Sequence, residues 1–185
     1  MSASPYERFM DDALPTLSGE NTPDNIYAKP AEWVASGAGA QGNLFLTGRA
    51  GTGKTTLLRK FMEYAGDSAI VLAPTGVAAM NAGGQTLHSF FKFPPRLIEP
   101  TDVKRLRTAR LMKTAETIII DEISMVRADM LDAIDRSLKL NRGSKRPFGG
   151  VRMILSGDLH QLPPVVRGEE VEILNERYGG SYFFN

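Results

Sequence analysis

The sequence predicts an α/β protein in which a parallel β-sheet lies between layers of helices. Four short apolar runs lack polar alternation, as expected for strands that are buried on both faces. Stretches with helical periodicity separate these runs. Glycine-rich or polar segments follow the strands, at the edge where the functional loops of such a sheet lie.

The predicted strands are residues 43–47, 69–73, 117–121 and 151–156. A helix is predicted over 54–64, and another over 128–140, where Met130, Leu131, Ile134 and Leu138 share one face. Residues 1–40 carry scattered Pro, Gly, Ser and Ala and indicate a helical or linker segment. Residues 41–185 are therefore predicted to form the folded lobe.

Composition bounds the function. The chain has 185 residues, of which 42% are hydrophobic, which is enough for one domain with a core. The net charge of +1 means that any nucleic-acid contact must come from local clusters. The absence of cysteine excludes disulfides and thiolate metal sites. No signal peptide or membrane-length apolar run is evident, so a cytoplasmic protein without membrane contact is expected.

A phosphate-binding loop lies between the first predicted strand and the first predicted helix. GRAGTGKT, residues 48–55, matches G-x-x-x-x-G-K-[ST] in full. Backbone N–H groups of such a loop surround a β-phosphate, the lysine reaches the β- and γ-phosphates, and the hydroxyl binds Mg²⁺. The alternative is a glycine-rich turn with an incidental Lys-Thr pair. The predicted nucleotide-binding residues are Gly48, Ala50, Gly51, Thr52, Gly53, Lys54, Thr55 and Thr56.

ETIIIDEISM, residues 116–125, supplies two adjacent carboxylates at the end of the third predicted strand. Asp121 is placed to hold Mg²⁺ together with Thr55. Glu122 is predicted to polarise the water that attacks the γ-phosphate, which makes it a catalytic candidate beside Lys54. The alternative for Glu122 is an acid that favours the start of a helix. A small-molecule kinase needs no such water activator.

Three further segments give the chain a family resemblance: APTGVAAMNAGG (73–84), TLHSFFKFPPR (86–96) and SGDLHQLPPV (156–165). With the phosphate-binding loop and DEISM, they resemble helicase motifs I, Ia, Ib, II and III, in that order. They look like the RecD-like, 5′-to-3′ branch of superfamily 1 (group B), and most like the petite-integration-frequency (Pif-type) DNA helicases. The match covers residues 43–166 and implies the first RecA-like lobe, a P-loop NTPase fold that binds ATP and Mg²⁺.

The resemblance implies roles for polar loop residues. Gln161 would contact the γ-phosphate as a third catalytic residue and report its loss to the DNA side, although a plain surface loop is the alternative. Single-stranded DNA would be held by residues of two motifs: Pro74, Thr75, Gly76, His88, Ser89 and Phe90. An aromatic can stack on a base, but Phe90, Phe91 and Phe93 also form an apolar cluster, part of which must be core.

The segment 92–115 is predicted to be a short insertion. Its part from residue 103 to 115 holds five cations and no acid: Lys104, Arg105, Arg107, Arg110 and Lys113. On a helix these would surround Leu106, Leu111 and Met112, which face inward. The cations are either a basic edge along the single-strand path or a solvated surface. By resemblance, Phe93-Pro94-Pro95 is a candidate strand-separating pin.

The chain ends soon after the third motif, so the resemblance implies that the second RecA-like lobe is missing. That lobe carries an arginine finger, which contributes roughly 10³–10⁵ in turnover. Weak or undetectable activity and no unwinding are therefore expected of this chain alone. Gln41 lies in the wrong place for an adenine-reading motif, and Trp33 or Tyr27 could stack on the base instead. The alternative function is a regulatory or scaffolding nucleotide-binding module that does not move on DNA.

Overall fold

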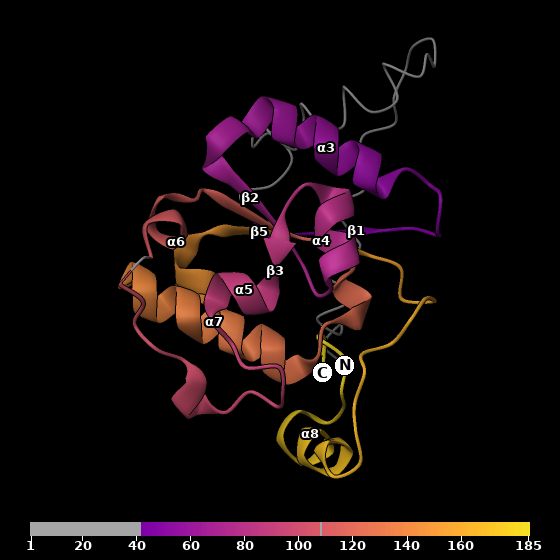
Figure 1. Cartoon of the computed structure of the whole chain (residues 1–185), viewed down its shortest axis with the longest axis vertical. Coiled ribbons are helices and arrows are strands. Elements are labelled where there is room, and N and C mark those ends of the chain that lie inside the picture. Colours follow the sequence, from indigo (N-terminus) through magenta and orange to yellow (C-terminus); the bar gives the residue numbers. More distant parts are fainter. Residues whose placement is uncertain (1–41, 108) are drawn as a thin grey trace, which may run out of the picture.

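A five-stranded parallel sheet organises the protein (Figure 1), and the strand order is β1-β5-β4-β2-β3. The structure is a computed structural model that describes residues 42–107 and 109–185. The strands are β1 Leu44–Thr47, β2 Ala69–Ala73, β3 Gln85–Thr86, β4 Thr117–Ile120 and β5 Arg152–Gly157. Because all the strands run parallel, the loops that follow them meet at one edge.

The helices connect these strands and cover both faces of the sheet. They are α3 Lys54–Ala65, α4 Gly76–Ala82, α5 Leu87–Phe91, α6 Arg110–Thr114, α7 Ala128–Arg142 and α8 Glu170–Tyr178. Single 3₁₀ turns lie at η1 Gly66–Ser68, η2 Pro100–Asp102, η3 Ile123–Met125 and η4 Pro147–Gly150. Figure 1 shows α3 on one side of the sheet and α5, α6 and α7 on the other.

The apolar core divides into two layers because successive residues of a strand point to opposite faces. Ile118 and Ile120 of β4 pack in the larger layer with side chains of α5, α6 and α7, whereas Ile119 faces the α3 side with Leu58 and Phe61. All three isoleucines are fully buried. The unbroken apolar runs of the central strands thus follow from burial on both faces.

The predicted strands correspond to β1, β2, β4 and β5 with shifts of at most one residue at each end, and the two predicted helices correspond to α3 and α7. The sequence reasoning missed β3, which is only two residues long and polar. For the basic stretch 103–115 it considered the arrangement that a helix would give, and among the described residues there the helix is α6, Arg110–Thr114. Leu111 was expected to face inward and is instead 52% exposed.

Polar side chains of α7 bind the backbone of the segment between α5 and β4. Asp129 Oδ2 accepts from the backbone N–H of Ile98 at 2.9 Å, and Asn141 Oδ1 accepts from that of Leu106 at 2.8 Å. Arg142 Nη1 donates to the carbonyl oxygens of Met112 and Ala115 at 2.6 and 2.9 Å. These contacts satisfy backbone groups that a segment with little regular structure leaves open.

No helix within residues 42–107 and 109–185 is long and apolar enough to cross a membrane. The predicted segment 1–40 and the adenine candidates Tyr27, Trp33 and Gln41 lie outside the described residues.

Candidate nucleotide site and nucleic-acid interface

The loop between β1 and α3 has the backbone shape that a phosphate requires. Gly51 and Gly53 have φ angles of 76° and 87°, in the left-handed region that glycine adopts without strain. Gly53 caps α3, and no side chain caps the N–H groups of its first turn. These donors, together with the helix dipole, favour an anion at this point.

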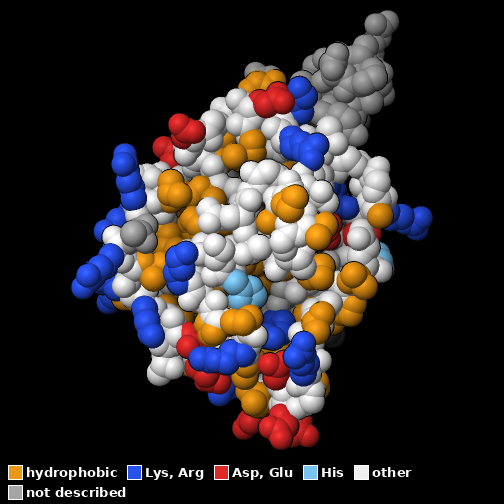
Figure 2. Space-filling model, viewed as in Figure 1, with side chains coloured by type: hydrophobic (Ala, Val, Ile, Leu, Met, Phe, Trp, Pro, Cys, Tyr) orange, Lys and Arg blue, Asp and Glu red, His pale blue; other side chains and the backbone are white. Residues whose placement is uncertain are grey.

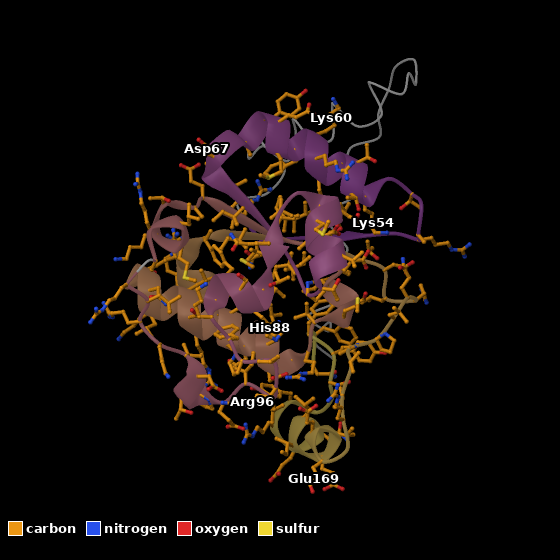
Figure 3. All side chains as sticks on the ribbon, in the orientation of Figure 1. Lys54, Lys60, Asp67, His88, Arg96 and Glu169 are labelled. Atoms are coloured by element: carbon orange, nitrogen blue, oxygen red, sulfur yellow. The ribbon has the colours of Figure 1, made fainter. Side chains whose placement is uncertain are left out.

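Lys54 lies at the first position of α3, and its ammonium group is held over the loop (Figure 3). Nζ donates to the carbonyl oxygens of Gly48 at 2.6 Å and Arg49 at 3.0 Å. Thr52 Oγ1 donates to the same Arg49 carbonyl at 2.8 Å, which tightens the turn. The loop therefore holds the Lys54 ammonium group against two of its own carbonyl oxygens.

Two oxygen ligands suited to a hard cation meet behind the loop. Thr55 Oγ1 donates to Asp121 Oδ2 at 3.4 Å, although the two residues are 66 positions apart. Asp121 directly follows β4 and is only 4% exposed. Within the described part of the chain, no group of three or more His, Cys, Asp or Glu residues could hold a metal. A hydroxyl and one carboxylate fit Mg²⁺, which takes few protein ligands and completes its shell with phosphate oxygens and water.

Glu122 has an unusual backbone for a residue with a side chain, with φ 55° and ψ 43°. Such conformations cost of order 1 kcal/mol or more and cluster at functional sites. Its backbone N–H donates to Asp121 Oδ1 at 3.1 Å. Burial raises the pKa of the Glu122 carboxyl, the charge of Asp121 raises it further, and Lys54 partly opposes them. A raised pKa favours proton acceptance near neutral pH.

Gln161 is held by a residue that the sequence reasoning missed. Gln161 Nε2 donates to Asp158 Oδ2 at 2.9 Å, and the backbone N–H of His160 donates to Asp158 Oδ1 at 3.0 Å. These donors lower the pKa of the Asp158 carboxyl, with smaller contributions from the charges of Lys54 and His160. The signal in the sequence was an acid at the end of a predicted strand, three residues before the glutamine.

Motif III also lies close to motif II. A Cβ atom on Gly157 would come within 2.9 Å of Ile123 Cγ2 and 3.1 Å of the Ile123 backbone nitrogen. Only glycine fits this approach without displacing its neighbours. The end of β5 therefore packs directly on the turn that follows Glu122.

The predicted DNA-contact residues divide into accessible and buried side chains. Thr75 caps α4, and its Oγ1 accepts from the backbone N–H of Ala78 at 3.2 Å. Gly76 and Ser89 are exposed, and Pro74 is half-buried. Phe90 is only 8% exposed and packs edge-on against Phe91 at 4.9 Å. The ring of Phe90 therefore belongs to the core, as the notion of an apolar cluster around it implied, and little of it is accessible to a base.

Phe93 is buried as well, at 6% exposed, and stacks on Phe91 at 5.3 Å. It therefore cannot form the tip of a pin in this conformation. Pro95 is exposed and remains as the accessible part of that candidate.

Thr75 and His88 line a common pocket of about 370 Å³. Its other polar residues are Arg96, Arg127, Arg167 and Glu170. Burial lowers the pKa of His88, the charge of Arg127 lowers it further, and Asp129 opposes the shift. His88 is therefore neutral at physiological pH and can offer a hydrogen bond rather than a charge. Figure 3 shows His88 near Arg96 and away from Lys54.

The phosphate-binding loop, the carboxylate pair after β4 and the parallel sheet define a P-loop NTPase of the RecA-like type. The model of the PIF1-like helicase family matches residues 23–185. The chain belongs to this family.

The chain is similar to curated and solved members of that family. It is 38% identical to ATP-dependent DNA helicase PIF1 of Emericella nidulans over 70% of this chain and 19% of that protein. It is 36% identical to ATP-dependent DNA helicase PIF1 of Homo sapiens over 69% of this chain and 21% of that protein. It is 47% identical to the Pif1 helicase from Bacteroides crystallised with ADP-AlF3 and ssDNA, with a TM-score of 0.77 over 86% of this chain and 38% of that one.

Another solved structure, of two coordinating Pif1 helicases at forked dsDNA, matches with a TM-score of 0.78 and 45% identity over 90% of this chain and 40% of that one. The chain thus spans about a fifth of the length of the curated relatives and about two fifths of the solved ones.

Proposed function

We propose that this chain is the ATP-binding lobe of a 5′-to-3′ DNA helicase that couples ATP hydrolysis to movement along single-stranded DNA. The observation that carries the proposal is the meeting of Lys54, Thr55–Asp121, Glu122 and the Asp158–Gln161 pair at one edge of the sheet. Members of its family are named ATP-dependent DNA helicases, and one was crystallised with ADP-AlF3 and ssDNA.

In the proposed reaction, the backbone N–H groups of residues 50–56 and the Lys54 ammonium group hold the phosphates of ATP. Thr55 and Asp121 hold Mg²⁺, which would neutralise charge on the phosphate oxygens. Glu122 accepts a proton from the attacking water, as its raised pKa permits. The second N–H of the Gln161 amide, whose first N–H is held by Asp158, is free to donate to the γ-phosphate.

On the DNA side, the Thr75 hydroxyl, the Gly76 and Ser89 backbone and the neutral His88 position a single strand through its phosphates. Motifs Ia and Ib reach the pocket from β2 and α5, whereas Gln161 follows β5, so the two sites share one sheet edge. A second RecA-like lobe elsewhere in the whole protein would supply the arginine finger and the opposing DNA grip. The cytoplasmic location remains a prediction.

The test is thermodynamic coupling between nucleotide and DNA. The affinity of the chain for oligo-dT is measured by fluorescence anisotropy without nucleotide, with ADP and with a non-hydrolysable ATP analogue, each with Mg²⁺. A motor lobe should change its DNA affinity between the ADP and ATP states, and Gln161→Ala should remove that difference while retaining nucleotide binding. Tight nucleotide binding without any binding of oligo-dT would support the regulatory or scaffolding module instead.

A further inference from the structure

A cluster of seven cations surrounds the C-terminal end of α7, and we refer to it as the basic end. Its members are Lys104, Arg105, Arg107, Arg110, Lys113, Lys145 and Arg146, and all seven residues are exposed. In Figure 2, Lys and Arg side chains gather along the edge of the molecule where Figure 1 draws α6 and the C-terminal end of α7.

The backbone that carries most of the basic end is fixed, because side chains of α7 bind the backbone of residues 104–115 to the C-terminal end of that helix. Asn141, which is 3% exposed, accepts from the backbone N–H of Leu106 at 2.8 Å and donates to the carbonyl oxygen of Lys104 at 3.2 Å. Arg142 donates to the carbonyl oxygens of Met112, Lys113 and Ala115 at 2.6–3.2 Å. Both residues precede the loop that carries Lys145 and Arg146.

The charge of the basic end is not neutralised within the described residues. None of its seven cations forms an ion pair with an acid there. Arg136 and Lys139 on the same helix are, by contrast, paired with Asp132 and Asp135. The helix dipole of α7 favours cations at its C-terminus, but this effect is confined to the last turn. It does not account for seven cations in a chain of net charge +1.

An unneutralised row of cations fits a polyanionic backbone. Surfaces for single strands also present aromatic rings on which bases stack. Among the described residues, the only large apolar side chain that is well exposed within this segment is Leu111, which is not aromatic. Contact with phosphates alone, without stacking, is typical of sequence-independent binding to a duplex.

The basic end is also separate from the pocket that Thr75 and His88 line. That pocket includes Arg127 and Met130 at the N-terminal end of α7, whereas the basic end surrounds Arg142 at the other end. A helix of 15 residues spans roughly 20 Å. We propose that the basic end is a second nucleic-acid surface, which binds the phosphate backbone of double-stranded DNA independently of the nucleotide site.

The test compares two triple variants that remove the same charge from this 185-residue chain. Arg105→Gln/Arg107→Gln/Arg110→Gln neutralises the basic end, and Lys60→Gln/Arg136→Gln/Lys139→Gln neutralises cations that are paired with acids. Binding to a blunt mixed-sequence duplex and to oligo-dT is measured by anisotropy over a series of salt concentrations. A fluorescent ATP analogue and a melting curve report on the nucleotide site and the fold.

The basic-end variant should lose roughly tenfold or more in duplex affinity at low salt, and its slope of log K against log salt should fall by about 2–3. The control variant should lose much less, and ATP and oligo-dT binding should stay unchanged. An unchanged duplex affinity, an equal loss in the control, or an equal loss for oligo-dT would overturn the proposal, as would wild-type protein that binds no duplex. Should the triple variant melt early, Lys145→Gln/Arg146→Gln in the loop after α7 provides the same comparison.

Discussion

The edge of the sheet that carries the nucleotide site and the segment between α5 and β4 are built in opposite ways. Where the nucleotide site lies, the chain accepts costs: left-handed backbone at Glu122 and a carboxyl whose pKa is raised by burial. In the segment from 92 to 116, by contrast, side chains of α7 form hydrogen bonds with backbone N–H and C=O groups. Asp129, Asn141 and Arg142 supply these hydrogen bonds.

The difference indicates where function and stability reside. Residues that accept strain or unfavourable burial are expected to be replaceable without loss of stability but with loss of activity. Residues that satisfy backbone groups are expected to behave in the reverse way. The five predictions that follow test this division.

Made in the whole protein, Glu122→Gln should lower single-turnover ATP hydrolysis by about 10²–10⁴-fold while nucleotide affinity stays within about twofold, because the amide cannot accept the proton. Rapid quench with labelled ATP measures the first quantity and a fluorescent analogue the second. Normal hydrolysis by this variant would remove Glu122 from the reaction.

The same variant should alter stability with a definite pH dependence. The pKa of Glu122 is raised in the folded state, so its ionised form is disfavoured there and opposes folding above that pKa. Glu122→Gln should therefore melt at an equal or higher temperature than wild type near neutral pH. That advantage should disappear as the pH falls below the ordinary range of a glutamate. A lower melting temperature for the variant at neutral pH would contradict the inference that the ionised Glu122 carboxylate destabilises the folded state.

Lys54→Ala should weaken ATP binding by roughly 100-fold, since it removes charge-assisted hydrogen bonds to phosphate. The melting curve without nucleotide should change little, because the ammonium group serves only two loop carbonyls. Lys60→Ala on the same helix, whose partner is Glu63, is the matched control and should bind ATP normally. Equal weakening in both variants would indicate a general effect of charge rather than a phosphate contact.

Lys54 and Glu122 also show what the sequence alone can reveal. Lys54 and Glu122 were predictable because the spacing of their motifs and the apolar strands before them are local features. Asp158 and Gly157 were not singled out, since their importance depends on contacts with Gln161 and Ile123 that form only in the fold. Phe90 was left open for the same reason: an aromatic in a DNA-contact motif and an aromatic in a core look alike in sequence, and only packing places its ring in the core.

In the segment 92–116 the residue types were clear from the sequence, but the conformation was not. Its cations were evident, but its conformation depends on hydrogen bonds to residues about 30 positions away, so helical spacing was a poor guide to which side chains face inward. Leu111 is the particular case: it is 52% exposed, whereas the next residue, Met112, is buried in the core.

Arg142→Ala should lower the free energy of unfolding by about 2–3 kcal/mol, because hydrogen bonds from a charged donor to several carbonyl oxygens are lost together. Nucleotide affinity should remain unchanged. Urea denaturation measures the effect, with Lys139→Ala as a control that removes only an exposed ion pair and should cost well under 1 kcal/mol. A stable Arg142→Ala variant would mean that the segment is held by its apolar contacts alone.

Asp158 combines features of both kinds of residue: it is buried, and it accepts hydrogen bonds from His160 and Gln161 of its own loop. The variant Asp158→Asn tests whether it acts on function or on stability. Loss of the carboxylate should free the Gln161 amide and weaken the difference in DNA affinity between the ATP and ADP states several-fold, with ATP affinity little changed. If Asp158 acts by orienting Gln161, the double variant Asp158→Asn/Gln161→Ala should be no worse than Gln161→Ala alone. Additive losses would mean that Asp158 contributes to the coupling between nucleotide and DNA separately from Gln161.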